Sequence, residues 1–332
     1  MNGSMLRLLL VCPTLCHSFV LARQQSQSLL GSHQRRHVAV GRTSMSEAGR
    51  LADKVYLVTG STDGIGKHTA SRLAEEGATV IVHGRREAAV QEAVEFVQGN
   101  GRGQRVEGVV ADLSSLRGMN HLCDQVLART DRLDCLLNNA GEEGDKGFGG
   151  WSGVFEADFR HSDDGVEYTF AVNVLAPYVI TGRLLSLIAK APEGGRVVNV
   201  ASLSASYSLD FDNLQFEKGG YSDHASYSLS KLLDIMFNAE LARRAPEGVT
   251  CNSLDPGTVN TKMLRAGWGM GGIPITSAND EFFLATSEDV SDTSGRYFVS
   301  RRVYTPPPPA EDEEACRRLW SVLEDLSGFS YA

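Results

Sequence analysis

Tyr227 and Lys231 are the residues of this chain whose types and spacing most directly suggest chemistry. They lie in the run 225–241, where apolar residues such as Leu232 and Met236 recur at helical spacing, which predicts an amphipathic helix. Residues four apart project from the same side of a helix. An ammonium beside a tyrosine favours the phenolate and moves its pKa from about 10 towards neutrality. The pair could therefore serve as a general acid or base, although the same spacing also occurs on ordinary helices.

A glycine-rich turn lies near the start of the acidic part of the chain. Residues 54–59 (KVYLVT) predict a short buried strand, and residues 67–76 predict a helix that ends at Gly77. A glycine-rich turn between a strand and a helix can hold the pyrophosphate of a dinucleotide at the helix N-terminus. The predicted phosphate-binding residues are Gly60, Ser61, Thr62, Asp63, Gly64, Ile65 and Gly66.

The end of the next predicted strand, residues 79–83, indicates which dinucleotide is bound. A carboxylate at this point would bind the ribose 2′-hydroxyl of NAD, whereas basic residues accommodate the 2′-phosphate of NADP. The strand is followed by Gly84, Arg85 and Arg86, with no acidic residue. We therefore predict NADP(H) as the cofactor, bound by both arginines; an ordinary surface arginine pair is the alternative.

Further strands and helices alternate along the rest of the chain, which predicts a doubly wound α/β fold with a parallel sheet. The predicted strands are 105–111, 133–137, 196–200 and 249–254, the last of them closing the core sheet. The predicted helices are 116–130, 166–187 and, at the end of the chain, 311–326, which follows a rigid extended connector at 306–309. We expect one domain, residues 47–332.

Four motifs in this order resemble the short-chain dehydrogenase/reductase family over residues 53–330. They are TGxxxGIG at 59–66, DL at 112–113, NNAG at 138–141 and YxxxK at 227–231. The segments 211–221, 238–244 and 317–320 further resemble the retinol dehydrogenase-like branch. The resemblance implies a Rossmann fold and an oxidoreductase.

The resemblance also assigns roles to individual residues. Asp112 and Leu113 would contact the adenine, and Asn139, Ala140 and Gly141 would line the ribose side. Asn173 would hold a water on the proton path, Ser202 would bind the substrate oxygen, and Tyr227 and Lys231 would bind the cofactor and transfer the proton. The turn after residue 254 would bring backbone to the nicotinamide. Its predicted cofactor-binding residues are Pro256, Gly257, Val259 and Thr261.

The predicted reaction is reversible hydride transfer between NADP(H) and a small-molecule carbonyl or alcohol. Residues 262–285 are expected to form a substrate lid, and the glycine-rich stretch 144–153 a loop on the substrate side. Few long apolar residues occur in 262–279, which argues against a retinoid substrate. The alternatives are an ene-reductase of the protochlorophyllide reductase kind in a plastid, and a non-catalytic NADP(H)-binding sensor or scaffold.

Charge divides the chain into a basic leader and an acidic body. Residues 1–46 hold five Arg and no acidic residue, so the remainder carries all 41 acidic groups and all but five of the 32 basic ones. So acidic a body is a poor partner for nucleic acid. The leader combines an apolar run that resembles a signal peptide with a basic stretch that resembles a transit peptide, which favours a plastid. The alternatives are a mitochondrion, the secretory route and, if translation starts at Met45, the cytoplasm.

Three further expectations come from the composition. No run of 18 apolar residues occurs, so no transmembrane span is expected. Cys123, Cys135, Cys251 and Cys316 lack metal-ligand spacing, so we expect buried, reduced thiols and no metal site. The helices predicted at 166–187 and 225–243 could pair between subunits in a homo-oligomer.

Overall fold

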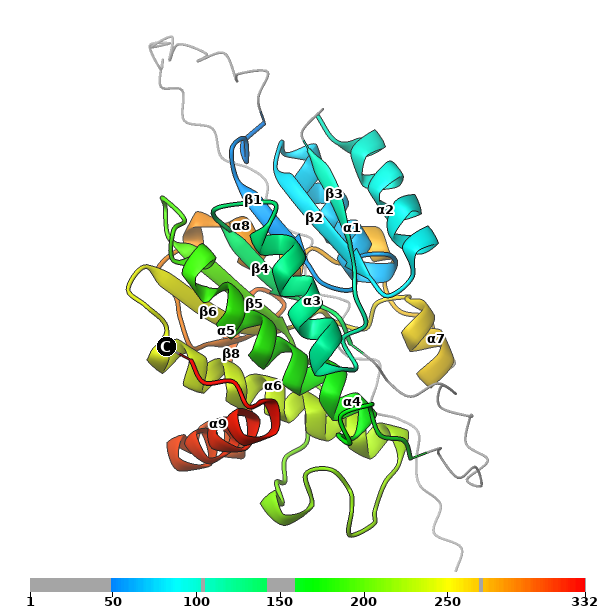
Figure 1. Cartoon of the computed structure of the whole chain (residues 1–332), viewed down its shortest axis with the longest axis vertical. Coiled ribbons are helices and arrows are strands. Elements are labelled where there is room, and N and C mark those ends of the chain that lie inside the picture. Colours follow the sequence, from blue (N-terminus) through cyan, green and yellow to red (C-terminus); the bar gives the residue numbers. More distant parts are fainter. Residues whose placement is uncertain (1–48, 103–104, 142–158, 269–270, 332) are drawn as a thin grey trace, which may run out of the picture. The chain divides into compact units, whose positions relative to one another are not determined.

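The computed structural model describes residues 49–102, 105–141, 159–268 and 271–331. A mixed eight-stranded sheet runs through this part of the chain, in the order β3-β2-β1-β4-β5-β6-β7-β8 (Figure 1). The pairs from β3 to β7 are parallel, and β8 is antiparallel to β7. The strands are β1 (Val55–Val58), β2 (Thr79–Gly84), β3 (Val106–Val110), β4 (Cys135–Asn138), β5 (Gly195–Val200), β6 (Val249–Asp255), β7 (Tyr297–Val299) and β8 (Arg302–Tyr304).

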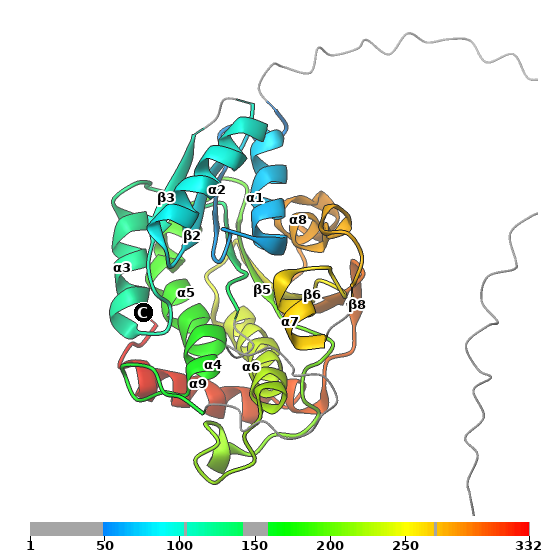
Figure 2. The same cartoon turned by 90° about the vertical axis from the view of Figure 1, so that its right-hand side faces the viewer.

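Helices cover both faces of this sheet, as Figure 2 shows from the side. One face packs on α1 (Gly64–Glu75), α2 (Glu87–Asn100) and α8 (Asp280–Thr286). The other packs on α3 (Leu116–Leu127), α5 (Ala176–Ile188) and α6 (Asp223–Arg244), and α9 (Glu313–Ser327) packs on α6. The fold is thus the predicted Rossmann-type, doubly wound sheet. Burial on both faces explains the almost purely apolar strands, such as VYLV in β1.

The position of β1 explains where a ligand can bind. This strand pairs with β2 on one side and with β4 on the other, so the chain winds outward in both directions from it. In open parallel sheets, ligands bind outside the carboxyl ends of the strands, at the point where the winding reverses. The loops that follow β1, β2, β4 and β5 meet at that edge.

The predicted helix 166–187 is one long helix with an irregular turn near its start. It consists of α4 (Tyr168–Phe170), a π-helical segment (Ala171–Leu175) and α5. The described residues contain this single helix, Tyr168–Ile188, that is long and apolar enough to cross a membrane, and 78% of its apolar window is buried in the fold. A buried core helix produces the same pattern, so the finding is weak evidence for a span.

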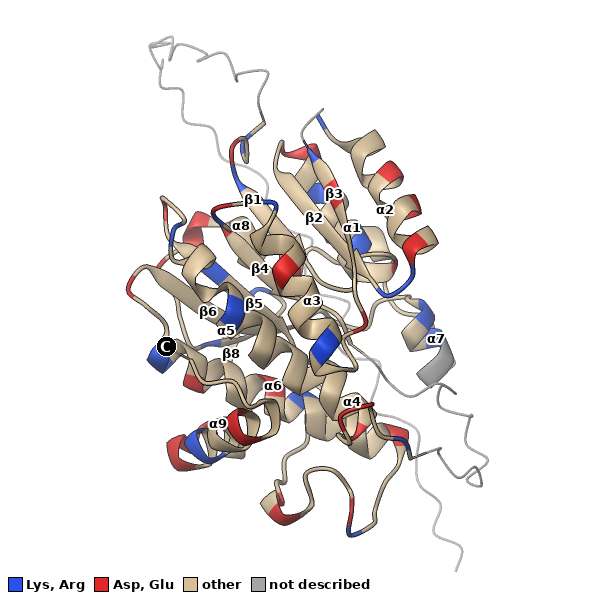
Figure 3. Ribbon diagram, viewed as in Figure 1, with Lys and Arg blue, Asp and Glu red and all other residues tan. Residues whose placement is uncertain are grey.

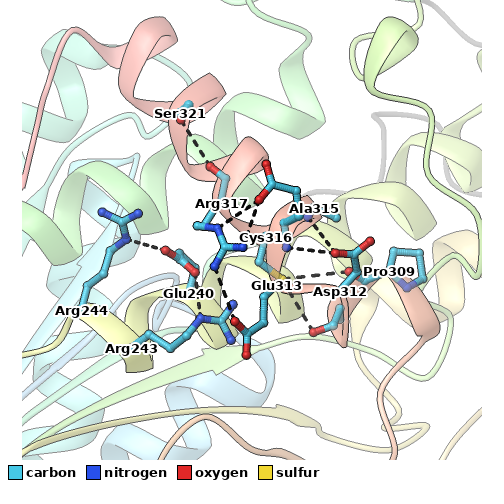
Figure 4. A network of polar contacts seen from close by, with 12 residues as sticks. Glu240, Arg243, Arg244, Pro309, Asp312, Glu313, Ala315, Cys316, Arg317 and Ser321 are labelled. Carbon is cyan, nitrogen blue, oxygen red and sulfur yellow. Dashed lines mark hydrogen bonds and ion pairs between the residues drawn. The ribbon is translucent and has the colours of Figure 1, made fainter.

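The C-terminal helix α9 packs along α6. Asp312 caps α9 by accepting hydrogen bonds from the backbone N–H groups of Glu314 and Ala315, as drawn in Figure 4. On α6, the buried carboxylate of Glu240 accepts hydrogen bonds from Arg243 at 2.9 Å and Arg244 at 2.6 Å. These contacts stabilise the first turn of α9 and the last turns of α6.

The residues after α9 cover part of α5. A side chain at Gly182 would collide with the rings of Phe329 and Tyr331. The Tyr331 hydroxyl donates to the Tyr178 carbonyl at 2.7 Å, and the Tyr178 hydroxyl donates to the Phe329 carbonyl at 3.0 Å. The tail is therefore an ordered part of the fold.

Several element boundaries differ from the predictions. Helix α1 begins at Gly64, inside the glycine-rich turn, because Asp63 caps it. The strand 249–254 does not close the sheet, since β7 and β8 follow it. The connector 306–309 is not extended throughout, because Pro308–Ala310 is a short 3-10 helix.

The range predicted as a lid, residues 262–285, extends beyond the cavity mouth into the core of the fold. Its end is α8, where Glu281, Phe282 and Leu284 are buried against the sheet and α1. The predicted loop 144–153 and the leader, residues 1–46, lie outside the described residues.

Two further features are the distribution of charged side chains and the state of the cysteines. Figure 3 shows basic and acidic positions interspersed over the described elements, with basic positions in the loop before α2 and at the start of α7 (Lys262–Trp268). Cys123, Cys135, Cys251 and Cys316 are buried and not in disulfides, as predicted.

Candidate active site

A cavity of about 340 Å³ lies at the carboxyl ends of the central strands. Its wall is formed by the turn after β1, the ends of β2 and β3, the segment after β4, helices α4 and α6, and the segment after β6. Sixteen of the predicted site residues line it: Gly60, Thr62, Asp63, Gly64, Ile65, Gly66, Arg85, Asp112, Leu113, Asn139, Ala140, Gly141, Tyr227, Lys231, Pro256 and Thr261. Residues far apart in the sequence therefore share one wall.

The glycine-rich turn brings the N-terminus of α1 to this cavity. Gly60 has a φ of +64°, and a side chain there would lie 2.8 Å from the Cα of Ala140. The Asp63 carboxylate caps α1 by accepting a hydrogen bond from Gly64 N–H at 2.9 Å. Ser61, also predicted to bind phosphate, does not line the cavity; its buried hydroxyl donates to the Val58 carbonyl. The turn can hold an anion through its backbone N–H groups.

The segment after β4 is tied to the same turn. The Thr59 hydroxyl accepts hydrogen bonds from the backbone N–H groups of Asn139 and Ala140, each at 3.0 Å. The Asn139 amide in turn donates to the Thr59 carbonyl at 2.6 Å and to the Gly60 carbonyl at 3.2 Å. The Asn139 side chain thus holds two loops together as well as lining the cavity.

His83, at the end of β2, also lines the cavity and was not predicted. Its Nδ1 accepts a hydrogen bond from Gly60 N–H at 3.1 Å, which requires that Nε2 carries the proton that is donated to the Ala111 carbonyl at 3.1 Å. Burial lowers the pKa of His83 to about 4. A neutral imidazole therefore links the glycine-rich turn to the end of β3.

Arg85 and Tyr168 meet across the cavity. The Arg85 guanidinium donates to the Tyr168 hydroxyl at 3.2 Å, and both residues line the cavity. The guanidinium of Arg160 lies 3.6 Å from the centre of the Tyr168 ring. Arg86 does not line the cavity; it is exposed and occupies the N-cap position of α2. The structure therefore brings one of the two predicted arginines to the site.

Tyr227 and Lys231 both face the cavity from α6. The Lys231 Nζ atom lies 5.7 Å from the centre of the Tyr227 ring. The ammonium donates to the Val200 carbonyl at 2.8 Å and to the Asp234 carboxylate at 2.9 Å. Burial alone would lower the pKa of Lys231, but the charges of Asp234 and Tyr227 outweigh it and raise that pKa. Lys231 is therefore a cation at neutral pH.

Asn173 and Ser202 do not line the cavity directly. The Asn173 amide, 1% exposed, donates to the Ser230 hydroxyl at 2.9 Å. A side chain at Gly141 would lie 3.7 Å from both Asn173 Oδ1 and Lys231 Nζ, so these two groups converge behind the cavity wall. Ser202 follows the lining residue Ala201 at the end of β5, and its hydroxyl accepts from Ser204 N–H at 3.0 Å.

The segment after β6 forms the last wall. Pro256 and Thr261 line the cavity, whereas Gly257 and Val259 do not. The Val259 side chain is buried and its backbone pairs with Ile273, which joins the two ends of the intervening segment.

Lys262, at the start of α7, forms an ion pair with Asp63 across the mouth of the cavity. The two charged atoms are 2.5 Å apart, and both residues line the cavity. This contact connects the predicted lid with the glycine-rich turn.

Nine lining residues were not among the predicted catalytic or cofactor-binding residues, although the last two lie in the range predicted as a lid: His83, Gly84, Ala111, Tyr168, Val172, Val200, Ala201, Lys262 and Met263. Most adjoin a predicted residue, so the signal that could have found them is their place at a strand end. Tyr168 has no such signal, because no sequence motif marks the start of α4.

Comparison with known proteins agrees with this geometry. The family model described as short chain dehydrogenase matches residues 54–268. Human retinol dehydrogenase 13 is 32% identical over 296 residues, which cover 84% of this chain and 86% of that protein. Mouse retinol dehydrogenase 14 is 34% identical over 309 residues, covering 85% and 88%. The short-chain dehydrogenase TIC 32 A, chloroplastic, of Brassica napus is 30% identical over 286 residues, covering 80% and 85%.

Two solved structures share the fold. An uncharacterized protein from Mycobacterium paratuberculosis has a TM-score of 0.66 at 22% identity, over 85% of this chain and 96% of that one. A short chain dehydrogenase from Shigella flexneri in complex with NADP has a TM-score of 0.60 at 24% identity, over 76% and 98%. The family match and the retinol dehydrogenase relatives show that this chain belongs to the short-chain dehydrogenase/reductase family of oxidoreductases and is retinol dehydrogenase-like.

Proposed function

We propose that this protein interconverts a carbonyl and an alcohol with NADP(H), and that Tyr227 is its general acid and base. The observation that supports this most is that Tyr227 and Lys231 face the same cavity as the glycine-rich turn. A proton donor and a dinucleotide cradle are thereby brought to one place. The family supports an oxidoreductase acting on alcohols or carbonyls.

The residues of the cavity fit a nicotinamide dinucleotide. The turn at Gly60 presents the N-terminus of α1 to the cavity, where backbone N–H groups can bind a pyrophosphate. Leu113 and Ala140 offer apolar surface for the adenosine, with Asp112 at its rim. A bound nicotinamide would supply or accept the hydride. Ser61, Gly257 and Val259 act indirectly in this proposal, by shaping the loops that touch the cofactor.

Preference for NADP(H) rests on Arg85. Its guanidinium lines the adenosine end of the cavity and can pair with a 2′-phosphate once it exchanges its hydrogen bond to Tyr168. Arg86 is exposed beside it and would add only long-range attraction. Replacing Arg85 with Ala should therefore weaken NADPH binding about 10- to 100-fold and NADH binding little. The same change at Arg86 should have a much smaller effect.

The proton is transferred by Tyr227 in this proposal. In carbonyl reduction the phenol donates to the substrate oxygen, and in alcohol oxidation the phenolate accepts the proton. The Lys231 ammonium favours the phenolate and can bind ribose hydroxyls with its remaining N–H. Ser202 would turn its hydroxyl towards the substrate oxygen, and Asn173 would hold a water behind Lys231.

Residues 262–277 are the part of the predicted lid, 262–285, that remains a lid in this proposal. This segment is pinned at its base by the pairing of Val259 with Ile273, and it touches the glycine-rich turn through Lys262. Helix α8, from Asp280 onward, is part of the core and is excluded from the lid. The lid can therefore close over the substrate by moving α7 while its base stays fixed.

Replacing Tyr227 with Phe tests the proposal, using protein begun at Met45 and a panel of carbonyls and alcohols. The panel includes retinol and retinal, because the named relatives are retinol dehydrogenases. Loss of the general acid should reduce kcat by about 10²- to 10⁴-fold while NADPH binding is retained. Turnover near the wild-type rate in Tyr227→Phe would refute the role of Tyr227. Tight NADPH binding without turnover of any substrate in the wild type would favour a sensor or scaffold.

We also propose that residues 1–46 direct the protein to an organelle, with a plastid favoured. The chloroplastic relative TIC 32 A lends support, as do the five arginines and the absence of acidic residues in the leader. Residues 1–46 fused to a fluorescent protein should accumulate in plastids of an algal host. Accumulation in mitochondria, in the secretory pathway or in the cytoplasm would each refute the plastid assignment.

A further inference from the structure

The ion pair between Lys231 and Asp234 is a feature of the candidate site that the proposed mechanism does not use. Asp234 follows Lys231 by three residues on α6 and, like it, is buried, with side-chain exposures of 4% and 6%. The carboxylate is 2.9 Å from the ammonium. Asp234 itself does not line the cavity. A buried carboxylate needs such a partner, since an unpaired charge away from water is costly.

The pair fixes the ammonium in place. An ammonium has three N–H donors, and two of those of Lys231 point to Asp234 and to the Val200 carbonyl at the end of β5. One donor is left for the cavity. Lys231 is therefore held by one contact within its own helix and one contact to the sheet.

The pair also changes the charge that Tyr227 experiences. The ammonium lies 5.7 Å from the centre of the Tyr227 ring. The Asp234 carboxylate, 2.9 Å from the ammonium, therefore lies within about 9 Å of the ring centre and has the opposite sign. Tyr227 experiences both charges, and the carboxylate cancels part of the cation's effect.

Other titratable groups lie on the elements around α6. They are Arg196 on β5, Cys251 and Asp255 on β6, Tyr168 on α4, and Glu313, Glu314, Cys316, Arg317, Arg318, Glu324 and Asp325 on α9, and Tyr297 on β7 interacts electrostatically with Tyr227. The charged group that acts on the pKa of Asp234 is Lys231, which opposes the effect of burial; burial prevails and raises that pKa to about 6. At neutral pH the carboxylate is thus mostly ionised.

We propose that Asp234 is a positioning residue of the active site, which holds the Lys231 ammonium and reduces the charge that acts on Tyr227. The inference rests on the proposed role of Tyr227. In this proposal, Asp234 sets the pH range in which Tyr227 works. Removing the carboxylate takes away the negative charge that opposes the ammonium, which favours the phenolate at every pH where Lys231 is protonated.

The test is the pH dependence of alcohol oxidation with NADP by the full chain. Asp234→Asn keeps the size of the side chain and an oxygen that accepts from Lys231, but removes the charge. In the pH profile of kcat/KM, the acid limb reflects formation of the phenolate. This limb should shift to lower pH by about one unit. Glu240→Gln is the matched control, since it neutralises another buried, paired carboxylate on α6. It should leave the limb unchanged.

The outcomes are distinct. A downward shift in Asp234→Asn with none in Glu240→Gln supports the inference, and an unchanged or upward-shifted limb overturns it. If the Asn variant does not fold, Asp234→Ser removes the same charge with a smaller side chain and must show the same downward shift. Near-wild-type turnover in Tyr227→Phe would instead refute the proposed function itself.

Discussion

His83 should make both stability and cofactor binding sensitive to acid. The imidazole is buried between the glycine-rich turn and the end of β3, accepting a hydrogen bond from Gly60 N–H and donating one to the Ala111 carbonyl. Protonation would place an N–H on Nδ1, directly opposite the Gly60 N–H. Two donors would then face each other in a buried site, and the turn would have to move.

The magnitude follows from the pKa of His83, which burial lowers to about 4 from its ordinary 6.5. Because the folded pKa is depressed, this histidine costs no stability above pH 6.5. Below it, the unfolded chain takes up a proton that the folded chain does not, and the loss reaches about 2 kcal/mol at pH 5 and about 3 kcal/mol at pH 4. NADPH affinity should fall in the same range, since the turn that moves is the phosphate cradle.

The assay is urea unfolding of the wild type and of His83→Asn at several pH values from 8 to 5. The Asn variant should be less stable at pH 8, because it cannot make both hydrogen bonds, and the difference should shrink by about 2 kcal/mol at pH 5. A difference in stability between wild type and His83→Asn that stays constant from pH 8 to pH 5 would refute the reasoning.

Three further predictions concern the same region and its supports. Gly66→Ala would push a methyl group into the glycine-rich turn and should weaken NADPH binding more than 10-fold by fluorescence titration, whereas Gly99→Ala, in open space, should not. Lys262→Ala removes the ion pair to Asp63 and a cation at the cavity mouth, and should raise the Kd for NADPH about 5-fold, less so at high salt. Burial raises the pKa of Glu281 to about 7 from 4.5, so the wild type loses stability as the pH rises from 4.5 to 7. The free energy of unfolding of Glu281→Gln, measured in urea relative to the wild type, should therefore be about 2 to 3 kcal/mol higher at pH 8 than at pH 4.5.

Most of the fold could be predicted, because the strands buried on both faces are nearly pure apolar runs. The strands β7 and β8 could not. Each has three residues, and the residues that join them, Ser300 and Arg301, adopt φ values of 50° and 62°. Two-residue hairpin turns of this kind usually contain Asn-Gly, so Ser-Arg gave no turn signature. The end of the lid range was mistaken for a loop because α8 is only seven residues long.

Residues of the candidate site that are part of a sequence motif could be predicted. Residues that are placed there only by hydrogen bonds to distant parts of the chain could not. Gly60, Tyr227 and Lys231 were located by motif spacing together with the order of the motifs along the chain. His83 and Tyr168 act through partners 23 and 83 residues away, Gly60 and Arg85, and no local pattern encodes such pairs. Asp234 was invisible for a further reason: a charge three residues after a lysine usually marks a solvated helix face.

The π-helical segment Ala171–Leu175 has a consequence for the part of the cavity wall that holds Tyr168 and Arg85. A π-turn contains one residue more than an α-turn, and each residue of an α-helix advances the chain by about 100° around the axis. Without that additional residue, everything before the segment would be rotated relative to α5, and Tyr168 would point away from Arg85. The orientation of one wall of the cofactor cleft is thus set by the count of residues in a neighbouring turn, independently of which residues they are.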